Sequence, residues 1–159
     1  MFEWASYHDS QAEACWQLLH ASVQAIPLSF YTLAQKEAWS PANAPANWAA
    51  RLITTQPTLL FSSNSSEKQL IGFAELIPAS SYLDCFYIHP DWQGYGAGKF
   101  LYQQIEQQAK SHQLPYLAVD VSLNAIPFFL RQGFIEIHQQ ANQRDDITLY
   151  NVRMVKSLV

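Results

Sequence analysis

A glycine-rich turn at residues 93–98 constrains the fold of this chain more than any other segment. Its sequence is Gln-Gly-Tyr-Gly-Ala-Gly; it follows an apolar stretch at residues 83–88 that predicts a strand, and it opens a helical pattern over residues 98–112. Glycine lets the backbone approach a ligand closely because no Cβ intervenes. The first amides of a helix, at the positive end of its dipole, form a ready anion site. The turn therefore predicts a phosphate-binding site in an α/β fold, although three glycines before a helix also fit a purely structural turn.

The turn does not match two common nucleotide-binding motifs. A P-loop requires Gly-Lys followed by Ser or Thr, whereas Lys99 is followed by Phe100. The glycine spacing also departs from the Gly-x-Gly-x-x-Gly of dinucleotide-binding folds, and no acidic residue ends a second parallel strand at the required distance. The anion site is therefore of another class.

Composition limits what the chain can bind. Of its 159 residues 49% are hydrophobic and 14% charged, where about 25% charged is typical, so one packed domain over residues 1–159 is expected. The net charge of −4 argues against a sequence-independent grip on nucleic acid, and the unpaired Cys15 and Cys85 exclude a disulfide framework or a cysteine-based zinc site. No apolar run approaches the ~18 residues of a membrane helix, and the first residues lack a basic leader, so we expect a cytoplasmic protein that binds neither membrane nor nucleic acid and holds no metal.

The rest of the chain alternates short apolar strands with amphipathic helices. Strands are expected at residues 2–8, 58–62, 70–77, 82–88, 116–121, 134–140 and 147–155, and helical patterns at residues 14–26, 31–39, 47–55, 98–112 and 125–132. Polar turns are expected at residues 62–67 and 141–146. The pattern predicts an α/β fold with a mixed, mostly antiparallel sheet of about six to seven strands flanked by about four helices.

Two motifs resemble those of the GNAT superfamily of N-acetyltransferases. Residues 83–98, Leu-Asp-Cys-Phe-Tyr-Ile-His-Pro-Asp-Trp-Gln-Gly-Tyr-Gly-Ala-Gly, resemble its acetyl-CoA motif, in which a strand ending in Tyr, a hydrophobic residue and Pro precedes Gln/Arg-x-x-Gly-x-Gly/Ala. Residues 124–134, Asn-Ala-Ile-Pro-Phe-Phe-Leu-Arg-Gln-Gly-Phe, look like its second signature, an Asn and a short aromatic helix before Gly-Phe. The motifs have the family's usual separation, and the resemblance covers essentially the whole chain, including features of a branch of small bacterial members.

The resemblance implies a binding site for acetyl-CoA in a sheet that is splayed beside the glycine-rich turn. Backbone groups of Phe86, Tyr87 and Ile88 would pair with the pantetheine arm, and Asn124 would hydrogen-bond that arm, cap a helix, or do both. Phe128 and Phe129 would pack near the thiol end. The amides implied for the pyrophosphate are those of Gln93, Gly94, Tyr95, Gly96, Ala97, Gly98 and Lys99.

The implied reaction is attack of an amine on a thioester, which requires a proton acceptor for the amine. Glu75, a lone carboxylate in the apolar strand at residues 70–77, is the first candidate, because burial makes a carboxylate a better proton acceptor. Asp84, at the start of the cofactor strand, is the second. Each also fits a structural role, and His89, which precedes a proline, fits a loop residue better than a base.

The departing thiolate lacks the family's usual proton donor. Many members carry Tyr where this chain has Phe129. Tyr87, Tyr150 or water could protonate the thiolate, and the pattern does not choose among them.

The acceptor is expected between the two early helices and the last hairpin. Tyr31, Trp39 and Trp48 could form an aromatic wall there, although tryptophans at such positions also fit plain core packing, and His138 could face the same groove. Together with the acidic candidates they suggest a small primary amine, cationic or aromatic. A non-catalytic acyl-CoA-binding or sensory module is the alternative function, and exposed strand edges allow a homodimer.

Overall fold

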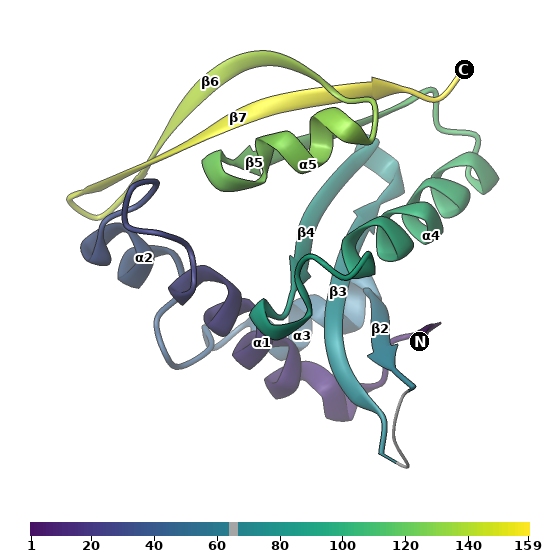
Figure 1. Ribbon diagram of the computed structural model, residues 1–159, viewed down its shortest axis with the longest axis horizontal. Helices are drawn as coiled ribbons and strands as arrows, with labels where there is room; N and C mark the ends of the chain where they lie inside the picture. Colours follow the sequence, from purple (N-terminus) through teal and green to yellow (C-terminus); the bar gives the residue numbers. More distant parts are fainter. Residues whose placement is uncertain (64–66) are drawn as a thin grey trace.

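The computed structural model describes residues 1–63 and 67–159, and it forms an open seven-stranded sheet with helices on both faces (Figure 1). The strands are β1 (Phe2–Ala5), β2 (Thr58–Ser62), β3 (Gln69–Ile77), β4 (Tyr82–Ile88), β5 (Tyr116–Ser122), β6 (Ile135–Arg144) and β7 (Ile147–Ser157). The α-helices of the described residues are α1 (Ala12–Gln24), α2 (Leu33–Trp39), α3 (Trp48–Thr55), α4 (Ala97–Ser111) and α5 (Ile126–Arg131). Their order and type confirm the predicted fold, whereas the turn expected at residues 62–67 lies partly outside the described residues. Among the described helices, none is long and apolar enough to span a bilayer.

The sheet is divided at the contact between β4 and β5. The strand order is β1-β2-β3-β4-β5-β7-β6, and every neighbouring pair is antiparallel except β4 and β5. Those two strands run parallel and pair only at Tyr82↔Ala118 and Leu83↔Val119. Beyond Leu83 they part, which confirms the expected splay and leaves a gap that opens toward the carboxyl ends of both strands.

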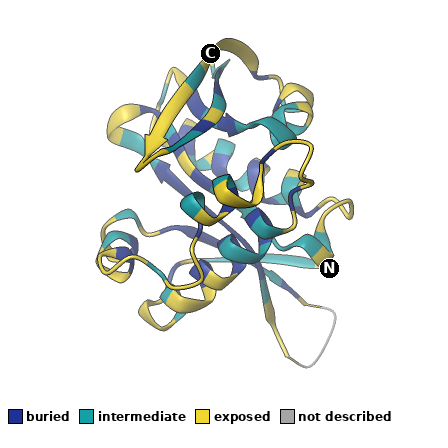
Figure 2. Cartoon of the chain, turned by 90° about the vertical axis from the view of Figure 1, so that its left-hand side faces the viewer, coloured by how far each residue is buried: buried dark blue, intermediate teal, exposed yellow. Residues whose placement is uncertain are grey.

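Two hydrophobic clusters lie on opposite faces of the sheet. Leu101, Ile105 and Ala109 form the buried stripe of α4 and pack on one face, together with residues of α5. The other face is covered by α1 and α3, through Trp16, Trp48 and others. Figure 2 shows that buried residues lie along the strands and on the inner sides of the helices, while the outer sides are exposed.

One extra residue in β4 sets the direction of its side chains. Across the β3–β4 pair, a two-residue step in β3 is matched by a three-residue step from Leu83 to Phe86. Leu83 and Phe86 both pack on the α4 side, whereas Asp84 and Cys85 line the same cavity on the α1–α3 side. The bulge therefore turns two consecutive side chains to one face, where a regular strand would have alternated them.

The β6–β7 hairpin reaches across the molecule to α2 (Figure 1). The Gln35 Nε2 donates to the Thr148 carbonyl at 3.0 Å, and the Arg144 Nη1 donates to the Trp39 carbonyl at 3.4 Å. The turn predicted at residues 141–146 is present but shorter than expected, because strand pairing continues to Arg144↔Ile147 and leaves only residues 145–146 in the turn. The longer hairpin forms one end of the cavity described below.

Candidate active site

The glycine-rich turn leads from a short 3-10 turn (Pro90–Trp92) into α4. Gly94 and Gly96 have φ values of +85° and +86°, and a Cβ added to either would meet no atom within 4 Å. Gly96 is the N-cap of α4, and among residues 1–63 and 67–159 no side chain caps the first turn of this 15-residue helix. Amides at the start of α4 are therefore open to an external anion.

Gly98 serves a close approach between α4 and α5. A Cβ at this position would lie 3.0 Å from the Phe128 ring. Phe128 packs against Phe86 with ring centroids 5.6 Å apart, and the buried Phe129 packs edge-on against Phe86 and Phe134. Phe128 and Phe129 thus form an apolar wall beside β4, and Phe129 is a core residue with no hydroxyl to offer.

The backbone of β4 divides its hydrogen-bonding groups between β3 and the gap. The His89 amide donates to the Ile71 carbonyl of β3 at 2.7 Å. Because alternate residues of a strand face the same neighbour, Tyr87 also faces β3, whereas Phe86 and Ile88 face the gap. Of the three residues expected to pair with a ligand through their backbone, two are oriented for it.

Two polar groups beside the gap differ in whether they can still accept a hydrogen bond from a ligand. The Ile88 carbonyl already accepts hydrogen bonds from the Ser22 Oγ at 2.7 Å and the Gln93 Nε2 at 3.0 Å. The Asn124 Oδ1, which follows β5, is buried and accepts no hydrogen bond from any described residue. A buried acceptor without a donor costs about 1–3 kcal/mol, so an N–H group of a ligand would be stabilised there.

A cavity of about 530 Å³ opens on the α1–α3 face of the sheet. It is bounded by α1, α2, α3, β4, β5 and the β6–β7 hairpin. Predicted site residues that line it are Asp84, Tyr150, Tyr87, Tyr31, Trp39 and Trp48. The sequence placed these residues in separate roles, and the fold brings them to one cavity.

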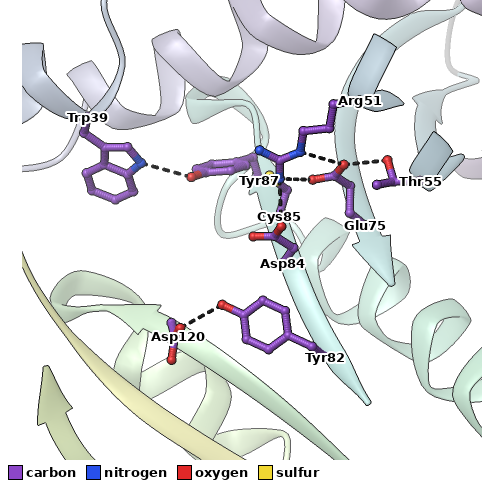
Figure 3. Close-up of polar contacts among 9 residues, drawn as sticks. All are labelled: Trp39, Arg51, Thr55, Glu75, Tyr82, Asp84, Cys85, Tyr87 and Asp120. Carbon is purple, nitrogen blue, oxygen red and sulfur yellow. Dashed lines mark hydrogen bonds and ion pairs between the residues drawn. The ribbon is translucent and has the colours of Figure 1, made fainter. Parts of the chain in front are cut away.

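Hydrogen bonds fix the aromatic wall of this cavity. The Tyr31 hydroxyl donates to the Tyr150 carbonyl at 2.6 Å and accepts from the Leu123 amide at 2.9 Å. The Trp39 Nε1 donates to the Tyr87 hydroxyl at 3.2 Å (Figure 3). Burial raises the pKa of Tyr87 well above its usual range, so this hydroxyl keeps its own proton at neutral pH.

Tyr31, Trp48 and His138 lie less favourably than Trp39 for contact with an acceptor. Tyr31 is 2% exposed, and its hydroxyl is already hydrogen-bonded within the fold. Trp48 is 4% exposed; its Nε1 donates to the Ala12 carbonyl at 2.8 Å, and its ring packs edge-on against Trp16. His138 is exposed on β6 and lines a different groove, together with Arg153.

A polar cluster around Arg51 forms the floor of the cavity beside β4 (Figure 3). The Arg51 Nη2 lies 2.5 Å from Glu75 Oε1, 2.9 Å from Asp84 Oδ2 and 3.3 Å from Cys85 Sγ. The Arg51 Nε and the Thr55 Oγ1 donate to Glu75 Oε2 at 3.2 and 2.6 Å. One carboxylate oxygen of Glu75, one of Asp84 and the Cys85 Sγ lie within 4.8 Å of one another, and the Arg51 guanidinium supplies the positive charge among them.

The two predicted base candidates differ in access. The Glu75 side chain is 0% exposed and both of its oxygens accept hydrogen bonds, whereas the Asp84 side chain is 42% exposed and lines the cavity. Partial burial raises the pKa of Asp84, and the Arg51 charge opposes that rise. Asp84 is therefore the carboxylate of the pair that can exchange a proton with a molecule in the cavity.

Asp120 forms a second polar cluster that bridges the base of the gap. Its carboxylate accepts from the Tyr82 hydroxyl at 2.8 Å, the Gln140 Nε2 at 2.8 Å and the Arg153 Nε at 2.5 Å. Partial burial would raise the pKa of Asp120, but these hydrogen bonds outweigh burial and lower it. Asp120 is thus a saturated, ionised group that ties β4 to β5 (Figure 3).

Sequence reasoning missed several of these residues. Asp120 is a lone carboxylate in an apolar stretch, the same signal that selected Glu75, and could have been found. Arg51 and Thr55 share a helix face at a spacing of four residues, but nothing local connects that face to Glu75.

An open mixed sheet that splays beside an uncapped, glycine-rich helix start defines an acetyltransferase-like class of α/β fold. The comparison with known families agrees: the model of the acetyltransferase (GNAT) domain matches residues 19–158. The chain belongs to this family.

Individual relatives support the same assignment. A GCN5-related N-acetyltransferase from Rhodopseudomonas palustris is 28% identical, with a TM-score of 0.88 over 98% of this chain and 94% of that one. The PaiA N-acetyltransferase from Thermoplasma acidophilum, solved in complex with coenzyme A, has the same fold at 16% identity, with a TM-score of 0.73 over 99% of both chains. The uncharacterized N-acetyltransferase ycf52 of Gracilaria tenuistipitata var. liui is 33% identical over 79 residues, which are 48% of this chain and 43% of that protein. The chain thus spans somewhat less than half of the length of this curated relative.

Proposed function

We propose that this chain is an acetyl-CoA-dependent N-acetyltransferase that acts on a primary amine of a small molecule. The observation that carries the proposal is the meeting of two sites at the β4–β5 gap. On one face lies the uncapped start of α4, and on the other lies a cavity with an accessible carboxylate, Asp84. Family membership and the coenzyme A complex of the PaiA relative support the choice of cofactor.

The residues beside the gap fit acetyl-CoA. The amides of residues 94–99 would bind the pyrophosphate, where Gly94 and Gly96 leave space for it. Lys99, which is exposed, would add positive charge. The Phe86 backbone and the Asn124 Oδ1 are suited to the amide groups of the pantetheine arm. The bound cofactor would supply an acetyl thioester, whose carbonyl carbon an amine attacks while the CoA thiol departs.

Asp84 is the residue we assign as the proton acceptor for the amine. An amine with a pKa near ~10 arrives protonated and must lose a proton before it can attack. The raised pKa of Asp84 makes it a better acceptor than an exposed aspartate, and the carboxylate borders the cavity. Glu75, the first candidate from the sequence, is better suited to anchoring Arg51, because it has no exposed surface.

A tyrosine hydroxyl is suited to protonate the departing thiolate. Tyr150 lines the cavity and is 41% exposed. The Tyr87 hydroxyl accepts from Trp39, and burial raises its pKa, which makes it a weaker proton donor than Tyr150. Phe129 cannot take this role, since its side chain has no hydroxyl to donate a proton, and it is packed against Phe86 and Phe134.

The size and charge of the cavity favour a small cationic acceptor. A volume of about 530 Å³ lies within the range of small-molecule sites, and Trp39 of α2 and Arg144 of the hairpin, which both line the cavity, are hydrogen-bonded to each other. The buried Glu75 neutralises Arg51 and Arg153 neutralises Asp120, so that Asp84 remains as the uncompensated negative charge at the β4 wall, while Arg144 adds a positive charge at the hairpin end. An ammonium group would be attracted to that charge.

The proposal is tested by mixing the protein with acetyl-CoA and a panel of primary amines. We expect release of free CoA thiol that depends on both the protein and one class of amine, with the acetylated amine identified by mass spectrometry. Tight binding of acetyl-CoA without turnover on any amine would instead support the alternative, a non-catalytic acyl-CoA-binding module. The apolar surroundings of Phe129 are the observation that favours this alternative.

A further inference from the structure

The strongest polar feature that the proposed reaction does not itself use is the contact of Arg51 with two carboxylates. Arg51 comes from α3, Glu75 from β3 and Asp84 from β4, so three elements meet at one guanidinium. We propose that Arg51 is a positioning residue that, anchored by the buried Glu75, holds the Asp84 carboxylate at the cavity wall and sets its affinity for a proton. This inference rests on the proposed function, in which Asp84 is the base.

Several contacts hold the Arg51 guanidinium in one position on the side that faces Glu75. Its Nε and Nη2 donate to the two oxygens of Glu75, and the Thr55 Oγ1 also donates to one of them. The guanidinium carbon lies 5.4 Å from the centre of the Trp48 ring, which covers a further side. A planar fork held by a paired carboxylate and an aromatic ring has little freedom, and it therefore has a fixed direction toward β4.

On the side that faces the cavity, Arg51 contacts a single oxygen of Asp84. The Nη2 donates to Asp84 Oδ2 at 2.9 Å, and among the described residues no other side chain is hydrogen-bonded to this carboxylate. The β4 bulge makes the contact feasible, because it turns Asp84 to the same face as Cys85, whose Sγ also contacts Nη2. Figure 3 shows the second oxygen of Asp84 directed away from the guanidinium. That oxygen is the one free to accept a proton.

The charged groups around Asp84 predict the direction in which each substitution should move its pKa. Charged and titratable groups that act on Asp84 or are acted on by it are Arg51 from α3, Glu75 from β3, Tyr82, Cys85 and Tyr87 from β4, and Asp120 from β5. Partial burial raises the pKa of Asp84 most; Arg51 lowers it, and Glu75 and Asp120 raise it by smaller amounts. Arg51 and Glu75 therefore act on Asp84 in opposite directions, although they form one ion pair.

The test uses two variants, Arg51→Met and Glu75→Gln, and two readouts. Loss of the Arg51 cation should raise the pKa of Asp84, so the acid limb of kcat/KM should move to higher pH by about one unit, the lower end of what an adjacent arginine does to an aspartate. Loss of the Glu75 anion should lower the pKa and move the limb to lower pH. The Asp84 carboxyl carbon, followed by NMR titration in the same variants, should shift in the same two directions whether or not an amine substrate is known.

Controls separate positioning from folding. Arg131→Met removes an exposed cation from α5 and should leave both the pH limb and the Asp84 titration unchanged. The double variant Arg51→Met/Glu75→Gln buries no unpaired charge, and it should still shift the Asp84 titration upward, because Arg51 acts more strongly on Asp84 than Glu75 does. This variant keeps the test available if Arg51→Met alone fails to fold.

The outcome distinguishes this inference from the proposed function. Opposite shifts in the NMR titration support the positioning role, and matching shifts of the kcat/KM limb support it further. Shifts in the same direction, or an Asp84 titration that no variant moves, would overturn the role of Arg51 while leaving acetyl transfer intact. Absence of turnover with a normal NMR response would overturn the proposed function and leave the role of Arg51 in holding Asp84 intact.

Discussion

Glu75 carries its charge in the interior because Arg51 and Thr55 satisfy both of its oxygens. Taking a carboxylate out of water is costly, and partners with good geometry offset that cost. Asp84, nine residues further along the chain, shares the same cation but keeps access to the cavity. The roles of the two carboxylates are therefore set by burial and not by residue type.

Removal of Arg51 should destabilise the fold. Arg51→Ala leaves Glu75 buried without its cation, a type of change that typically costs about 3–5 kcal/mol, and the partial exposure of Arg51 places the expected value near the lower end. Urea unfolding of Arg51→Ala and of the exposed control Arg131→Ala measures the difference. A loss no larger than that of the control, about 0.5 kcal/mol, would contradict the role of Glu75 as an ion-paired core residue.

Both thiols should be unreactive in the folded protein. Burial raises the pKa of Cys15 to about 12, and burial also raises that of Cys85, so the reactive thiolate is scarce at pH 8. We expect slow labelling by a thiol reagent at pH 8 and full labelling of two thiols in urea, followed by absorbance. Fast labelling of the folded chain would show that these sites are more open than the structure indicates.

The sequence identifies candidate residues better than it ranks them. The sequence selects Glu75 as a lone carboxylate in an apolar strand and Asp84 from its place at the start of the next strand, and both assignments stay predictions. Their ranking depends on Arg51, which is 24 residues from Glu75 in sequence and reaches it only because α3 packs over β3. Burial and ion pairing of this kind come from tertiary contacts, which local patterns do not carry.

At the scale of elements, the glycine-rich turn and α4 form one unit. Positive φ at positions 94 and 96 favours glycine, and the missing side chains leave the uncapped amides of the helix open. Gly133, which follows α5, has a similar φ of +95° but serves a helix end elsewhere. Substitutions at Gly96 and Gly133 therefore separate the cost of backbone strain, which both share, from an effect on ligand binding, which only Gly96 should show.

Substitution of Gly96 should weaken binding of acetyl-CoA. Gly96→Asp places a carboxylate beside the proposed anion site. Repulsion between like charges a few ångströms apart near a protein surface is several kcal/mol, so affinity should fall at least about 100-fold. Gly133→Ala should cost a similar backbone strain of about 1–2 kcal/mol without loss of affinity. Calorimetric titration with acetyl-CoA compares them; equal affinity of Gly96→Asp and wild type would remove the turn from the cofactor site.

Element limits were predictable where glycine and proline mark them and less so elsewhere. β2 and β4 match their predicted ranges, and α4 differs by one residue at each end. The β6–β7 hairpin was predicted too short, because the polar residues 141–144 show no alternation although their backbones pair. The bulge in β4 arises from its register with β3, which the sequence of β4 alone does not contain.

At the scale of the whole molecule, the cavity joins the two halves of the sheet. α2 comes from the first half of the chain and the β6–β7 hairpin from its end, and Gln35 and Arg144 connect them. The family and fold follow from two local motifs, but the acceptor does not, because the cavity walls come from seven helices and strands. Acceptor specificity is therefore the property that is hardest to predict from the sequence.

Loosening the contact between α2 and the hairpin should affect the amine and not the cofactor. Gln35→Ala removes one hydrogen bond, worth about 0.5–1.5 kcal/mol, so KM for the amine should rise about 2–10-fold while the Kd for acetyl-CoA stays unchanged. Gln103→Ala, on the exposed side of α4, is the matched control. A parallel loss of cofactor affinity in Gln35→Ala would argue that this contact supports the fold as a whole.

The central claim, that Asp84 accepts the proton of an amine during acetyl transfer, is tested most directly by kcat/KM for amine acetylation in Asp84→Asn and Glu75→Gln. General-base catalysis contributes about 10²–10⁴-fold, so kcat/KM of Asp84→Asn should fall at least about 100-fold. Glu75→Gln keeps the size and shape of the side chain that anchors Arg51. Its kcat/KM should stay within about tenfold of wild type when both are compared at a pH equally far above the acid limb of each protein. Retention of activity in Asp84→Asn, or a larger loss in Glu75→Gln than in Asp84→Asn, would contradict the account.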